Sequence, residues 1–197
     1  MKTHLNPPLP PGIKPVIDKY FPPGSLRRKY YLTHVLKVTE LAFEIAHEKR
    51  LKGLDLRYLF YGSLLHDIGI VETDAPPIGC TGRHPYIAHT WLGRKILEEN
   101  GFADIALICE RHIGVGFTKE EIISMRLPLP HRDMLPVTIE EKLICYADKF
   151  YSKSEPYFTQ KKPVKIIREN FARRGKSFLE RWEALDAMFR IPSIISE

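Results

Sequence analysis

The segment Leu64-Leu65-His66-Asp67-Ile68-Gly69 decides the fold, because it ends an apolar helix with two metal-ligating side chains. The helix is expected to begin near Asp55 and to end at the turn that these residues make. Neighbouring side chains on a helix diverge by about 100°, so one site can take both His66 and Asp67 only where the helix ends or where two metals are held. The segment therefore predicts a metal site at a helix end.

Helical periodicity recurs on both sides of this segment, whereas alternating β-branched runs are nearly absent. Ser25 is a suitable N-cap, and Thr138 with Glu141 forms a capping box. The expected helices are a short one around Val16–Phe21, one from Ser25 to about Lys52, one from Asp55 to His66, one from Pro85 to Asn100, one from Ala103 to His112, one after Thr138, and two past Lys153. The sequence thus predicts an all-α fold.

The 197 residues fit a single domain with a real core. We expect a Pro-rich arm with a short helix over residues 1–24, the metal-binding helical domain over 25–152, and a helical extension over 153–197 packed on the same domain. The segment after Ser152 is the natural place for contacts with a specific substrate or partner.

Cysteine usage and hydropathy predict a cytoplasmic protein. The three cysteines are scattered without Cys-x-x-Cys spacing, as free thiols in a reducing compartment are. Residues 1–12 are rich in Pro and lack the apolar run of a signal peptide. No run of about 18 apolar residues predicts a membrane span.

The net charge of +6 suits an anionic ligand. Much of it lies between Lys161 and Lys176, where no aromatic interleaving or known motif accompanies the basic residues. This run therefore predicts a solvated helix face, and a nucleic-acid footprint is the less favoured interpretation. No oligomeric state follows from the sequence.

Helical geometry separates the eight histidines, because positions seven and eleven apart lie nearly in line on a helix. His34 is in line with Leu41 and Ile45 and therefore faces the core, whereas His47 lies on the opposite side. The same comparison predicts inward-facing His66, His89, His112 and Asp148. His4 and His131 are expected on the surface, and His84 is expected to face either an anion at the site mouth or solvent.

Six inward-facing histidines and aspartates together favour a metal site over six separate core residues. A single buried histidine is usually a satisfied core residue, but a buried imidazole or carboxylate costs several kcal/mol unless it is paired or binds a cation. A divalent metal satisfies all six at once. Imidazole and carboxylate together suit Fe, Mn or Zn, and carboxylate also suits Mg.

With His34 upstream and Asp148 downstream in Tyr146-Ala147-Asp148-Lys149, the motif resembles the HD-domain superfamily of metal-dependent phosphohydrolases. His89 in His89-x-x-x-Gly93 and His112 in Arg111-His112-Ile113-Gly114 resemble the HDIG subset. The resemblance covers roughly residues 26 to 152. It implies a compact HD-domain helical bundle, to which the C-terminal helices are added.

The six-ligand set resembles that of members with two divalent metals, including bacterial diadenosine tetraphosphate hydrolases and cyclic dinucleotide phosphodiesterases. The resemblance implies that Asp67 bridges the metals and is the catalytic residue. It implies that one metal is held by His34, His66 and Asp148, and the other by His89 and His112. A metal-activated water would then cleave a phosphoester or phosphoanhydride of a small nucleotide-like substrate.

Two departures from the subset bear on the substrate. The Lys that usually follows His-Asp-Ile-Gly is Ile70 here, which removes a phosphate contact. The Gly-Tyr-Pro signature of cyclic di-GMP enzymes is missing, which disfavours that activity.

Four residues beside the ligand motifs are candidates for binding the substrate phosphate, and they are Arg83, His84, Arg111 and Lys149. A surface salt bridge explains the two arginines and the lysine equally well. The loop from Gly114 to Thr118 either closes over substrate or simply ends a helix.

Three alternatives remain open on the sequence. The site can hold one metal and act as a nucleotidase, with His89 and His112 contacting substrate. A few HD-type folds resemble di-iron oxygenases that cleave C–C or C–P bonds, which iron redox chemistry and oxygen uptake would mark. The domain can also be a nucleotide-binding module with a structural metal.

Overall fold

The computed structural model describes residues 9–194 of the chain. The expectation for His4 and the outer part of the N-terminal arm falls outside these residues. Within them the fold is all-α, as predicted, with nine α-helices and one short antiparallel strand pair. None of the described helices combines the length and the hydropathy that crossing a bilayer requires.

The N-terminal helices begin where their caps predict. After the short helix α1 (Lys14–Tyr20), the Ser25 hydroxyl accepts a hydrogen bond from the amide of Arg28 at the start of α2 (Leu26–Glu48). Asp55 caps α3 (Leu56–Leu65) in the same way. Helix α2 ends before the predicted end near Lys52 and packs against α3.

The middle of the chain departs most from the sequence prediction. Pro85 is followed by a 3₁₀ turn, and the α-helix itself begins only at His89. The predicted helix from Ala103 is α-helical only from Leu107, and the α6 helix was not predicted. The elements are η1 (Ile68–Glu72), β1 (Asp74–Ala75), η2 (Pro76–Ile78), β2 (Cys80–Thr81), η3 (Tyr86–Ala88), α4 (His89–Glu99), α5 (Leu107–Arg111) and α6 (Lys119–Ser124).

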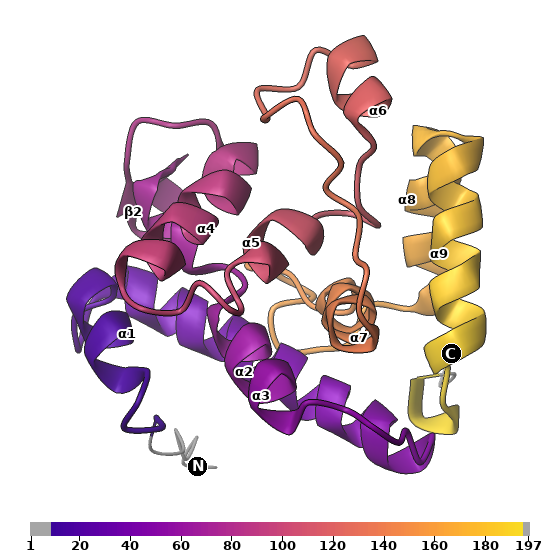
Figure 1. Cartoon of the computed structure of the whole chain (residues 1–197), viewed down its shortest axis with the longest axis horizontal. Helices are drawn as coiled ribbons and strands as arrows, with labels where there is room; N and C mark the ends of the chain where they lie inside the picture. The colour runs from indigo at the N-terminus through magenta and orange to yellow at the C-terminus, as the bar shows by residue number, and fades with distance from the viewer. Residues whose placement is uncertain (1–8, 195–197) are drawn as a thin grey trace.

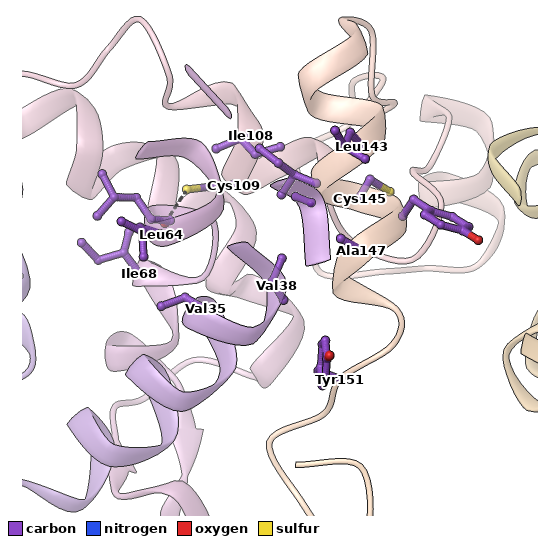
Figure 2. Close-up of a cluster of buried hydrophobic side chains, with 14 of the residues drawn as sticks. Val35, Val38, Leu64, Ile68, Ile108, Cys109, Leu143, Cys145, Ala147 and Tyr151 are labelled. Carbon is purple, nitrogen blue, oxygen red and sulfur yellow. Dashed lines mark hydrogen bonds between the residues drawn. The ribbon is translucent and has the colours of Figure 1, made fainter. Parts of the chain in front are cut away.

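Helix α7 (Ile139–Asp148) lies at the centre of the fold and packs against α2, α3, α5 and α9. It begins with the predicted capping box between Thr138 and Glu141. Figure 2 shows how side chains from α2, α3, α5 and α7 meet in one apolar cluster, with Val38, Ile108 and Leu143 among them. The core therefore joins the helices that carry the predicted ligands, and α4 enters it through Ile96 and Leu97 while packing on η1 and α5.

Two C-terminal helices complete the core. Figure 1 shows α8 (Val164–Arg174) and α9 (Lys176–Phe189) side by side along one flank of the molecule, and a final 3₁₀ turn, η4 (Pro192–Ile194), follows. The fully buried Trp182 stacks on Tyr146 of α7 and on Phe171 of α8, with ring centroids 5.1 and 5.6 Å away. This aromatic stack fixes α8 and α9 against the centre of the fold.

The backbone of η1 lies directly against α4 at Gly69. A Cβ atom at this position would lie 2.0 Å from the carbonyl oxygen of His89 and 2.4 Å from the amide nitrogen of Gly93. Only a residue without a side chain allows this approach, and the approach brings Asp67 and His89 to the same place.

We expect Gly69→Ala to lower the free energy of unfolding by about 3 kcal/mol, because two backbones must separate. Gly53→Ala is the matched control. Gly53 has a φ of +71°, and a Cβ added there would meet no atom within 4 Å, so its substitution should cost only about 1 kcal/mol of backbone strain. Urea unfolding of the two variants checks this, and equal losses would contradict the close approach.

Candidate metal centre

The six predicted ligands come from five parts of the fold and meet at one point. His34 lies within α2, whereas the others lie at helix boundaries, where short turns set their direction. Asp148 is partly buried, and the other five are at most 4% exposed. These residues are His34, His66 and Asp67 just after α3, His89 at the start of α4, His112 just after α5, and Asp148 at the end of α7.

One group of four ligands surrounds Oδ2 of Asp67. The Nε2 atom of His34 lies 3.0 Å from this oxygen and 2.9 Å from Oδ1 of Asp148. The Nε2 atom of His66 lies 3.3 and 3.5 Å from the same two oxygens. Ligand atoms from these four residues all lie within 4.8 Å of one another, which is the spacing that a single cation requires.

A second group surrounds the other oxygen of Asp67. The Nε2 atoms of His89 and His112 lie 3.4 and 3.5 Å from Oδ1. Asp67 therefore presents one carboxylate oxygen to each group. This is the arrangement that a carboxylate bridging two metals would have.

Backbone carbonyls orient three of the imidazoles. The Nδ1 atoms of His66, His89 and His112 lie 2.8, 2.6 and 3.1 Å from the carbonyl oxygens of Ser63, Tyr86 and Ile108. A carbonyl oxygen only accepts, so each Nδ1 carries the hydrogen and each Nε2 points into the centre as the coordinating nitrogen.

The donor set fits divalent metals. His89 and His112 bring their Nε2 atoms to 3.3 Å, and His34 and His66 bring theirs to 3.4 Å. Between His89 and His112, whose lowered pKa values keep both rings neutral, the facing Nε2 lone pairs repel, and a cation between them would convert that repulsion into coordination. Imidazole nitrogen with carboxylate oxygen is the ligand chemistry of Fe, Mn and Zn sites.

Electrostatics in the centre favours positive charge. Burial alone would lower the pKa of His66, but the carboxylates of Asp67 and Asp148 outweigh it and raise that pKa to about 9. Burial would raise the pKa of Asp67, yet Lys153 and His66 hold it well below its usual range. A metal entering the first group must therefore displace a proton from His66.

The histidines of the second group are neutral, in contrast to His66 of the first group. Burial lowers the pKa of His89 to about 3, although Asp67 opposes the shift. Burial likewise lowers the pKa of His112. Both imidazoles are therefore neutral near pH 7, which is the form that binds a metal.

Lys153 is the charged residue of the centre that sequence reasoning missed. Its Nζ forms an ion pair with Oδ2 of Asp67, and its side chain is only 12% exposed. Burial would lower the pKa of Lys153, but Asp67 raises it well above the ordinary value. Nothing in the local sequence separates Lys153 from a surface lysine, because the loop that follows α7 directs its side chain inward.

A cavity of about 720 Å³ opens from the metal centre. Its floor includes His34, Asp67 and His89, and its aromatic walls include Tyr86 and Phe171. Four cationic side chains line it, and they are Lys149, Lys153, Lys162 and Arg174. A cavity with these cations and aromatic walls suits an anionic ligand that carries an aromatic ring.

Of the four residues predicted to bind phosphate, the structure places only Lys149 in the cavity lining. Lys149 donates a hydrogen bond to the carbonyl of His112 at 2.9 Å and also contacts Asp148. Arg111 instead pairs with the buried Glu141 at 2.8 Å, outside the lining. The buried carboxylate of Glu141, which Arg111 neutralises, also caps α7.

Arg83 and His84 also lie outside the cavity lining. Arg83 is exposed, and the His84 ring packs edge-on against Trp91 with centroids 5.4 Å apart. An isolated bridge beside the strand pair explains this placement, because the amide of Asp74 donates to the carbonyl of His84 at 2.8 Å and holds the segment away from the centre.

Several other sequence predictions have clear positions. The three cysteines are free and His47 and His131 are exposed, as predicted, and the cysteines are also buried. In the loop from Gly114 to Thr118, Phe117 exchanges two backbone hydrogen bonds with Met134. Those bonds fix the loop as a wall of the cavity, to which Gly114 and Phe117 contribute.

Comparison with known proteins gives one family and several relatives. A family model described as HD domain matches residues 31–152. An uncharacterized protein of Methanocaldococcus jannaschii is 44% identical over 118 residues, which are 58% of this chain and 62% of that protein. No solved structure matches the chain.

Two further relatives are named tRNA (cytidine(56)-2'-O)-methyltransferase. The protein of Thermoplasma volcanium is 31% identical over 74% of this chain, and that of Picrophilus torridus is 39% identical over 50%. The matched segments are only 37% and 25% of those proteins. This chain therefore corresponds to a minor part of each.

We expect the protein purified without chelator to contain about two metal equivalents per chain, and His89→Ala to contain about one, because that substitution disrupts only the second ligand group. His47→Ala, on the exposed face of α2, is the control and should retain two. Elemental analysis measures both. One equivalent in the unsubstituted protein would contradict a second metal held by His89 and His112.

Proposed function

The chain belongs to the HD domain family, and on that premise we propose that it is a metal-dependent phosphohydrolase that cleaves a phosphoester or phosphoanhydride of a nucleotide-like substrate. The observation that carries the proposal is the position of Asp67. Its two oxygens serve two ligand groups at the floor of a cationic cavity.

Divalent metals held there would supply an activated water and neutralise charge on the phosphoryl oxygens. His34, His66 and Asp148 would hold the first with one oxygen of Asp67, and His89 and His112 would hold the second with the other. Asp67 is the proposed catalytic residue, because its loss removes a ligand from both groups.

Two lysines would orient the scissile phosphate. Lys149 and Lys153 line the cavity where it meets the ligands, and each contacts a ligand carboxylate. Position 70 supplies no such charge, because Ile70 is fully buried in the core. An ammonium group beside the reacting phosphoryl group stabilises negative charge that develops there.

The substrate class rests on the cavity. Cationic side chains and the rings of Tyr86, Phe117 and Phe171 line the same space, so a nucleotide can place its phosphate at the metal centre and its base against an aromatic wall. The names of the two methyltransferase relatives make a nucleotide of RNA a second source of that chemistry.

Metal-loaded protein is expected to release phosphate or a nucleotide from a panel of nucleoside phosphates, dinucleotides and short RNAs. Metal-dependent product release under nitrogen supports hydrolysis. Turnover that requires oxygen would replace the proposal with the oxygenase alternative, and tight nucleotide binding without turnover would replace it with the binding module.

Lys153→Ala should lower kcat by about 100-fold while metal content stays the same, because a charge at the scissile phosphate is lost and no ligand is removed. Lys29→Ala, which removes an exposed charge on α2, is the control. Steady-state kinetics with elemental analysis checks this. An unchanged kcat, or a loss of metal that explains the whole effect, would remove Lys153 from the mechanism.

A further inference from the structure

The cavity extends well beyond the metal centre, to a wall built by α8 and the segment before it. The lining residues of this distal wall are Lys162, Ile167, Asn170, Phe171 and Arg174. All of them follow residue 152, where the match to the family model ends. The distal wall therefore lies outside the matched HD domain and is a feature of this chain's C-terminal segment.

The distal wall carries two positive charges that form no ion pair with the described carboxylates. Over residues 9–194, no carboxylate lies within ion-pair distance of Lys162 or Arg174. Their neighbours differ, because Lys161 pairs with Glu44 at 3.2 Å and Arg168 pairs with Glu183 at 2.7 Å. The basic run from Lys161 to Lys176 is therefore not a solvated helix face throughout, because two of its cations line the cavity.

The fold fixes Lys162 at the cavity. Its backbone amide donates to the carbonyl of Phe150 at 2.8 Å, which ties this segment to the end of α7. The half-buried ammonium lies 5.5 Å from the centroid of the Tyr157 ring. Burial lowers the pKa of Lys162, the charge of Asp148 opposes that shift, and the nearby charges of Lys149 and Arg174 add to it. An anion bound between Lys162 and Arg174 would offset the repulsion among these cations.

Arg174 reaches across from the last turn of α8 toward the metal side. A Cβ atom at Gly114 would lie 3.5 Å from its Nη1, and Gly114 follows the ligand His112 by two residues. The guanidinium also lies 5.7 Å from the ring centroid of Phe171. Its planar donors suit bidentate binding of a phosphate, and none of the described carboxylates competes for them.

We propose that Lys162 and Arg174 form a second anion subsite, which binds a phosphate group other than the one at the metal centre. The preferred substrate class is therefore a nucleotide with two phosphate groups, either adjacent or on different positions of the sugar. This proposal rests on the proposed function, which assigns the first phosphate to the metal centre.

Ligands that cannot be hydrolysed test the subsite without turnover. Metal-loaded protein is titrated calorimetrically under nitrogen with methylphosphonate, methylenediphosphonate and propane-1,3-diphosphonate. At least one diphosphonate should bind about tenfold more tightly than methylphosphonate, because the second group gains charge-assisted hydrogen bonds. A preference for the short spacer identifies adjacent phosphates, and a preference for the long spacer identifies separated ones.

Variants show whether the gain comes from the distal wall. Lys162→Gln and Arg174→Gln should each remove the advantage of the diphosphonate and leave methylphosphonate binding unchanged. Arg174→Lys should retain part of it. Lys165→Gln, an exposed position of α8 outside the cavity lining, is the matched control and should change nothing. Thermal unfolding of each variant confirms that it is folded.

Two outcomes would overturn the subsite. One is equal affinity for methylphosphonate and both diphosphonates. The other is an advantage that survives in Lys162→Gln and Arg174→Gln, because chelation by the metals alone would then explain it. Failure of the proposed function is distinguishable, since a protein that hydrolyses no phosphate ester can still show a diphosphonate preference that depends on Lys162 and Arg174.

Discussion

The structure depends on the close approach of the six ligand side chains that the fold brings together around Asp67. Imidazole nitrogens of almost fully buried side chains approach within 3.3 and 3.4 Å of one another at the floor of the cavity. Such an arrangement costs free energy unless a cation is present. The remaining features serve that arrangement: carbonyls fix the imidazoles, Gly69 allows η1 to touch α4, and the apolar cluster of Figure 2 joins the helices that carry the ligands.

The chain divides into two parts with different contributions. The segment that matches the HD domain supplies all six candidate ligands and the central helix α7. The residues after it supply Lys153 and the distal wall, which Trp182 anchors through its stacking on Tyr146 and Phe171. We infer that the first part holds the metals and that the second adds Lys153 to the reacting centre and selects the ligand, as expected where specificity residues lie on segments added to a common fold.

Sequence reasoning succeeded where the signal was local or periodic. Thr138 and Glu141 cap α7 as predicted because a capping box is set by three-residue spacing, and the inward direction of His34 follows from the helical period. It failed where a partner distant in the sequence determines the direction of a side chain. Arg111 faces Glu141 rather than the cavity, and Lys153 faces Asp67. The residues next to Arg111 and Lys153 in the sequence indicate neither partner. The strand pair also escaped detection, because its strands of two residues are too short to show alternation.

The most direct measurement is anomalous X-ray diffraction from crystals of metal-loaded protein, recorded at the absorption edge of the bound metal. We expect two anomalous peaks about 3.5–4 Å apart, one beside each carboxylate oxygen of Asp67. A single peak beside His34, His66 and Asp148 would contradict the shared role of Asp67 and would leave His89 and His112 as substrate contacts. No peak near Asp67 would contradict the metal centre itself.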